Sequence, residues 1–95
     1  MLTDIDILQH NLTLLRKRCG WSVEELADML GCTQPVIYNL EDGTRQLSTL
    51  EYVGLRTIFE KRAVGNPFVD MALADIFDDY ELGSNKWLNQ IIKRR

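Results

Sequence analysis

The feature that most constrains the fold is the stretch EELADMLGCTQPVIYNLEDG (24–43), in which two short apolar-periodic segments meet at Gly31. One continuous helix is excluded, because Pro35 has no amide hydrogen and its ring clashes with the preceding helical turn. With Thr33 as the N-terminal cap, Pro35 falls in the first turn of a new helix, where the missing N–H has no intrahelical partner anyway. The stretch therefore predicts two short helices joined by a tight turn.

Residue types inside this stretch recur at the spacing that two crossing helices need. Counted from Val23, a small residue, Ala27, stands fifth, where the helices must approach closely. Gly31 stands ninth, where a left-handed backbone costs glycine least. Ile37 stands fifteenth and is expected to point into the crossing. This spacing is typical of a helix-turn-helix.

The rest of the chain also has the apolar periodicity of helices, so an all-α protein is expected. A first helix is predicted over about residues 5–18, and capping boxes at Ser22–Glu25 and Ser48–Glu51 predict the starts of two more. The helix after Ser48 is expected to end near residue 62. Its predicted apolar positions are Leu50, Val53, Leu55, Ile58 and Phe59.

Gly65-Asn66-Pro67 is the clearest helix breaker in the chain and suggests a boundary. We expect a helix-turn-helix domain over 1–64, with four to five helices, and a helical extension of one or two helices over 65–95.

Composition narrows the functional classes. The chain has 95 residues, is 45% hydrophobic and 26% charged, and carries a net charge of −3. This acidity argues against a nonspecific coating of DNA but allows a binder whose basic residues are concentrated on one face. No apolar run approaches the ~20 residues of a membrane helix, and no signal peptide is recognisable. Cys19, Cys32 and the lone His10 predict neither a metal site nor a cofactor, and no enzyme is expected.

The stretch LTLLRKRCGWSVEELADMLGCTQPVIYNLEDGTRQLSTLEYVGLRTIF resembles the phage-repressor/Cro-type (XRE-like) helix-turn-helix family over about residues 8–61. The shared elements are Arg16, GWSVEELA (20–27), Gly31, Ile37, LEDG (40–43) and a further capped helix from Ser48. The resemblance implies a lambda-repressor-like fold in which the helix from Thr33 to about Glu41 enters the DNA major groove. It also implies a half-buried ion pair between Arg16 and Glu41.

Removing the inward residues of that helix leaves a set of candidates for reading bases: Thr33, Gln34, Pro35, Tyr38 and Asn39. Gln34 and Asn39 stand out, because each amide can pair bidentately with adenine. Pro35 and the Tyr38 ring could pack on thymine methyl groups. The alternative is that these are simply exposed side chains, and Tyr38 could equally stack on the DNA backbone or on a partner.

Phosphate contacts are expected from helix N-termini and flanking donors. The candidates are Ser22, Val23, Thr44, Arg45, Gln46 and Thr49. Val23 departs from the family, which often has glutamine there, so only its main-chain N–H can contribute. Asp42 also departs, because it places a negative charge where a neutral or basic residue is usual.

The segment after Pro67 leaves two interpretations open, a dimerisation surface or helices that cap the core within the chain. The residues considered for a dimer interface are Phe68, Ile76, Phe77, Trp87, Leu88, Ile91 and Ile92. A symmetric dimer would place two reading helices on half-sites ~34 Å apart.

The leading hypothesis is a repressor-type regulator that binds double-stranded DNA as a homodimer in the cytoplasm of a bacterium, encoded there or by a phage. The alternative is a protein-interaction module, or an antitoxin-like protein, whose acidic stretch Asp70–Glu81 binds a protein partner.

Overall fold

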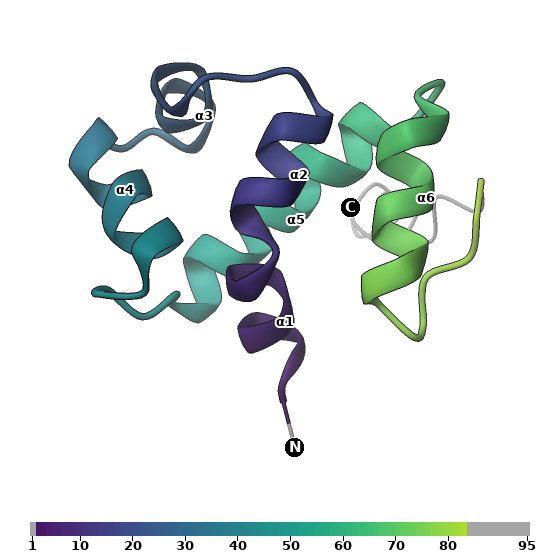
Figure 1. Cartoon of the computed structure of the whole chain (residues 1–95), viewed down its shortest axis with the longest axis horizontal. Helices are drawn as coiled ribbons and strands as arrows, with labels where there is room; N and C mark the ends of the chain where they lie inside the picture. The colour runs from purple at the N-terminus through teal and green to yellow at the C-terminus, as the bar shows by residue number, and fades with distance from the viewer. Residues whose placement is uncertain (1, 84–95) are drawn as a thin grey trace, which may run out of the picture.

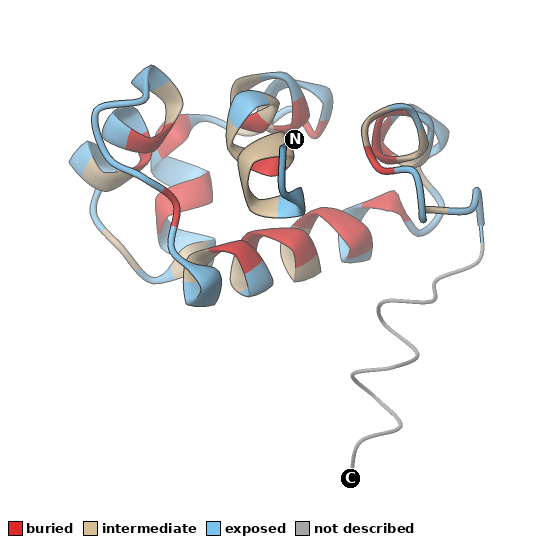
Figure 2. Ribbon diagram, turned by 90° about the horizontal axis from the view of Figure 1, so that it is seen from below, coloured by how far each residue is buried: buried red, intermediate tan, exposed pale blue. Residues whose placement is uncertain are grey.

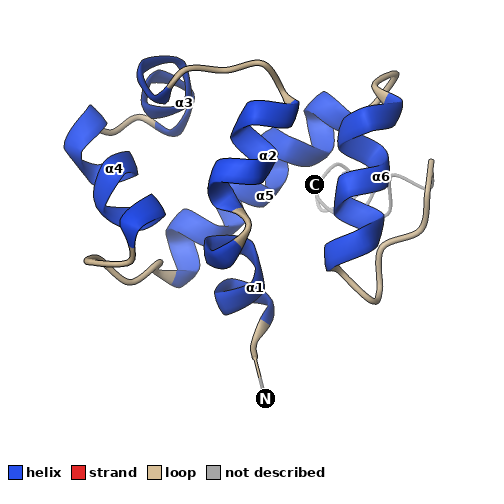
Figure 3. Cartoon of the chain, viewed as in Figure 1, coloured by secondary structure: helices blue, strands red, loops and turns tan. Residues whose placement is uncertain are grey.

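The computed structural model describes residues 2–83, which form six helices and no strand (Figures 1 and 3). The helices are α1 (Asp4–His10), α2 (Leu12–Arg18), α3 (Val23–Leu30), α4 (Gln34–Asp42), α5 (Thr49–Ala63) and α6 (Pro67–Ile76). The predicted all-α class is confirmed. Among the predicted dimer residues, Trp87, Leu88, Ile91 and Ile92 lie outside the described residues.

Helix ends follow the local chemistry of the sequence. The Ser22 and Ser48 side chains each accept the main-chain N–H three residues on, from Glu25 and Glu51, and those glutamates accept in return. Both predicted capping boxes are therefore confirmed. Gly31 ends α3 with φ +80°, a left-handed conformation that a β-carbon would disfavour.

The single helix predicted over residues 5–18 is wrong, because Asn11 separates α1 from α2. Asn11 has φ −108° and ψ 11°, outside the helical region. Its side-chain amide donates to the Ile7 carbonyl at 2.9 Å, a local hydrogen bond of the kind by which asparagine competes with helix geometry. The break turns the axis of α2 relative to α1 (Figure 1).

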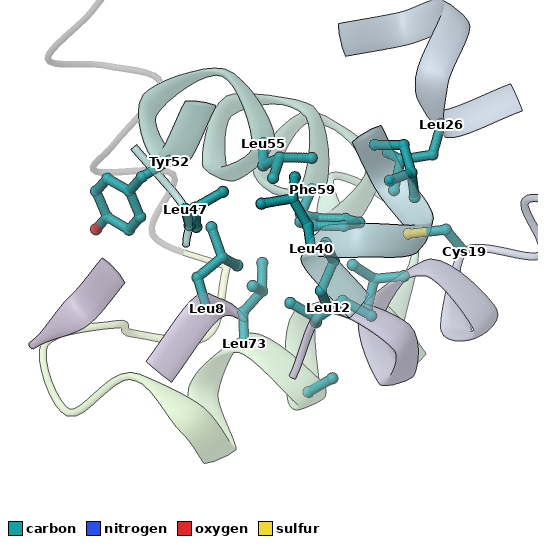
Figure 4. Close-up of a cluster of buried hydrophobic side chains, with 14 of the residues drawn as sticks. Leu8, Leu12, Cys19, Leu26, Leu40, Leu47, Tyr52, Leu55, Phe59 and Leu73 are labelled. Carbon is teal, nitrogen blue, oxygen red and sulfur yellow. The ribbon is translucent and has the colours of Figure 1, made fainter. Parts of the chain in front are cut away.

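The core lies between α5 and the helices packed on one side of it, and Figure 2 shows buried residues along that side of the long helix. Figure 4 shows leucines of several helices, among them Leu12, Leu26, Leu40 and Leu55, gathered around Phe59. A single cluster of buried side chains joins residues from all six helices.

Two of the apolar positions predicted for α5 are wrong. Leu50 is 83% exposed and Val53 is also exposed, whereas Arg56 and Glu60 are buried at 5% and 2% exposure. Arg56 Nε donates to Glu60 Oε2 at 2.7 Å and its Nη1 to the Tyr52 hydroxyl at 2.7 Å. The guanidinium also lies 4.2 Å from the centre of the Phe77 ring. Charged side chains occupy this part of the core because their partners come from the same helix, from Asp4 of α1 and from the chain after α6.

α6 packs against α2 and α5 and supplies Val69, Leu73 and the following Phe77 to the core. Ala72 is buried as well, whereas Phe68 is 69% exposed. The described part of the extension therefore caps the core within the chain, one of the two interpretations left open.

Candidate nucleic-acid interface

The outward side of α4 carries all of the candidate base-reading residues of that helix. At about 100° per residue, Gln34, Tyr38, Pro35 and Asn39 follow one another around an arc of about 140°. All four side chains are exposed, as is that of Thr33 at the helix cap. Tyr38 is 55% exposed. On this arc its ring lies between the side chains of Gln34 and Asn39, although Tyr38 and Asn39 are adjacent in the sequence.

The opposite side of α4 fixes that arc in space. Ile37 and Leu40 are fully buried against α3, where the small Ala27 is also buried. Pro35 occupies the first turn, and Thr33 caps by position only, because its side chain makes no capping hydrogen bond. Packed side chains therefore hold the arc in a defined orientation.

An ion pair ties the end of α4 to α2. Arg16 Nε and Nη2 donate to the two Glu41 carboxylate oxygens at 2.7 and 3.0 Å, and the Thr13 hydroxyl donates to Oε1 of Glu41 at 2.8 Å. The side chains of the pair are only 13% and 11% exposed. The hydrogen bonds to Glu41 raise the pKa of Arg16. Because the guanidinium binds both carboxylate oxygens, the pair fixes α2 and α4 relative to each other, which is a structural role.

The loop after α4 contains three of the candidate phosphate donors. Both donors of Thr44 are used within the loop, because its N–H and hydroxyl donate to Asp42 Oδ1 at 2.9 and 2.7 Å. These bonds lower the pKa of Asp42. The Asp42 carboxylate, which departs from the family pattern, therefore holds Thr44 in place within the loop. Arg45 is exposed and pairs with Glu51 at 2.7 Å, while Gln46 is exposed beside it.

The remaining candidates lie at helix starts. Val23 is the first residue of α3; its side chain is buried, and its main-chain N–H is one of the first-turn donors without an intrahelical acceptor. Ser22 and Thr49 are exposed at the starts of α3 and α5. Two helix N-termini, together with Arg45 and Gln46 of the loop after α4, thus offer exposed donors.

One comparison with known proteins gave a match. Residues 12–53 match a family model described as Helix-turn-helix. Over these residues the chain is similar to helix-turn-helix domains. The matched segment covers 42 of the 95 residues (53 − 12 + 1) and spans α2, α3, α4 and the start of α5. Neither the curated proteins nor the solved structures gave a match.

The helix-turn-helix supports a DNA-binding regulator, a class that is typically non-enzymatic. Within residues 2–83, no helix is long and apolar enough to cross a membrane, and no cluster of three potential metal-binding side chains occurs. Both cysteines are free thiols, and burial raises the pKa of Cys19 to about 11.

Sequence reasoning missed two side chains that shape this interface, Thr13 and Gln9. Thr13 donates to Glu41, and Gln9 is hydrogen-bonded to the loop after α4. Both lie on α1 or α2, 28 or more positions from their partners. A helical periodicity shows only that they are polar; it does not show what they contact.

Proposed function

We propose that the protein is a repressor-type transcriptional regulator that reads a DNA sequence in the major groove with α4. The observation that carries the proposal is the exposed arc of Gln34, Tyr38, Pro35 and Asn39 on a helix whose other side is fixed by core packing. Gln34 and Asn39 pair with base edges, and the Tyr38 ring packs against a base or the sugar between them. Arg45, Gln46 and the N-termini of α3 and α5 contact phosphates.

Selection from a random duplex pool, followed by fluorescence anisotropy on the enriched duplex, tests this proposal. We expect an enriched motif whose affinity falls about five- to a hundredfold in Asn39→Ala or Gln34→Ala, since a bidentate pair is worth about 1–3 kcal/mol. Asp78→Ala is the control, because Asp78 is exposed and lies beyond α6, outside the matched segment. Failure to enrich any motif would contradict DNA reading.

A homodimer would let two reading helices engage adjacent half-sites. Of the residues considered for its interface, Phe68 is exposed on α6, Ile76 is half-buried and Phe77 is 1% exposed, so the Phe77 ring already belongs to its own core. The side chains of Leu50 and Val53 on α5 are also apolar and exposed. Both surfaces are candidates for self-association.

Sedimentation of the full chain and two charge variants separates these surfaces. Phe68→Glu should convert dimer to monomer if α6 forms the interface, and Leu50→Glu should do so if α5 does. Both side chains are largely exposed, so neither substitution disturbs the core. A monomeric full chain at micromolar concentration would contradict the homodimer.

The protein-interaction alternative rests on the acidic stretch Asp70–Glu81. Two of its carboxylates already have internal partners: Asp70 accepts from Tyr80 and the Gly83 N–H, and Asp79 lies 3.6 Å from Arg56. These contacts leave less free negative charge for a basic partner than the sequence suggests. The alternative would gain support if Asp75→Ala and Asp78→Ala abolished a protein interaction while leaving duplex binding intact.

A further inference from the structure

The Gln9 side chain of α1 is hydrogen-bonded to the loop that follows α4. Its Nε2 donates to the Arg45 carbonyl at 2.7 Å and to the Leu40 carbonyl at 3.1 Å. Its Oε1 accepts the Leu47 N–H at 3.0 Å. Both hydrogens and the oxygen of one amide are thus used on main-chain groups more than 30 positions away.

Two of these hydrogen bonds are made to the peptide units on either side of Gln46. The Arg45 carbonyl belongs to the peptide unit before Gln46, and the Leu47 N–H belongs to the unit after it. Because the C=O and N–H of a trans peptide point in opposite directions, the Gln46 N–H points away from Gln9. Among the described residues it makes no hydrogen bond within the protein, and the Gln46 side chain is exposed.

The third bond connects this loop to the reading helix itself. Leu40 is fully buried in the last turn of α4, where carbonyls lack intrahelical donors, so Gln9 satisfies a group of the reading helix. The same amide therefore sets the position of Gln46 relative to the base-reading arc. Phosphate contacts fix the register of a protein on its duplex, so this spacing matters for binding.

We propose that Gln9 is a positioning residue for DNA binding: it holds the loop so that the Gln46 N–H and side chain meet a backbone phosphate when α4 is in the groove. The inference rests on the proposed function. Gln9 touches no base and no phosphate itself; it acts through the two peptide units around Gln46.

Gln9→Met tests the role, because it keeps the length of the side chain and removes all three hydrogen bonds. On the duplex recovered by selection, we expect about tenfold weaker binding at 100 mM salt. We also expect a slope of log affinity against log salt that is smaller by about one, as for a lost phosphate contact. Asn66→Ala is the matched control, because Asn66 is a half-buried amide at the start of α6 whose hydrogen bond from the Val69 N–H is local.

Gln9→Glu supplies a second variant if Gln9→Met does not fold. Its carboxylate would face two carbonyl oxygens, whereas its protonated form would again donate a hydrogen bond. We therefore expect its deficit relative to the wild type to shrink as the pH falls from 8 to 5. Wild-type affinity and salt slope in a folded Gln9 variant would overturn the inference, as would a loss of affinity with an unchanged slope that Asn66→Ala shares. If the wild-type protein binds no selected duplex, the proposed function fails and not the role of Gln9 alone.

Discussion

The Arg16–Glu41 pair ties the end of α4 to the rest of the fold. Arg16 also donates from Nη1 to the Trp21 carbonyl at 3.0 Å, so its guanidinium joins α2, the turn before α3 and the end of α4. Removing one partner of a pair this little exposed leaves the other charge poorly solvated. We expect Arg16→Ala to lower the free energy of unfolding by about 3 kcal/mol, measured by urea denaturation.

Arg45→Ala is the comparison for that measurement, because Arg45 forms an equally short ion pair but its side chain is 49% exposed. Solvent screens such a pair, so its loss should cost less than about 1 kcal/mol. Equal losses of unfolding free energy in Arg16→Ala and Arg45→Ala would show that burial does not strengthen the Arg16–Glu41 pair.

At the level of the elements, the contact between α3 and α5 depends on Gly54. A β-carbon added to Gly54 would lie 2.9 Å from Leu30 Cδ1, a methyl group at the end of a half-buried side chain. In Gly54→Ala, a gain of up to about 1 kcal/mol in helix propensity offsets the displacement of that methyl group. We expect the free energy of unfolding of Gly54→Ala to stay within about 1 kcal/mol of the wild type.

A larger side chain at the same position should separate the two helices. Gly54→Leu is expected to cost about 1–3 kcal/mol of stability by overpacking. It should also weaken duplex binding, since α3 supports the reading helix. Val53→Leu, one position earlier on the exposed side of α5, is the control for stability and should leave the free energy of unfolding unchanged. Unchanged stability in Gly54→Leu would mean that α3 can move without cost.

The helices show which parts of the fold can be predicted from the sequence. The start of α3 at Ser22, its end at Gly31 and the outward arc of α4 depend on neighbours within a few positions, so a helical period and local capping chemistry suffice to predict them. The burial of Arg56 depends on Phe77 and Asp79, which follow α6, and the exposure of Leu50 depends on which side of α5 the other helices cover. The role of Gln9 likewise depends on a loop more than 30 residues away. No local pattern carries that information.

At the scale of the whole molecule, we expect α6 to unfold in the same cooperative transition as the helix-turn-helix. Val69, Leu73 and Phe77 are buried at 1% exposure or less in the cluster that also holds the leucines of α2 and α5. Phe77 and Asp79 also face the buried Arg56. Removing α6 would therefore expose an apolar face and leave a buried charge with fewer partners.

A chain that ends at Val64 is accordingly expected to lose its cooperative unfolding transition. Burial of each of the three apolar side chains is worth about 1.5–3 kcal/mol, and their sum is comparable to the ~5–15 kcal/mol stability of a small domain. A chain that ends at Gly83 keeps every one of these contacts and should still unfold cooperatively, as monitored by circular dichroism in urea. If the shorter chain unfolds with the same midpoint and slope as the longer one, α6 is an appendage, and the helix-turn-helix is stable without the side chains that cover α2 and α5.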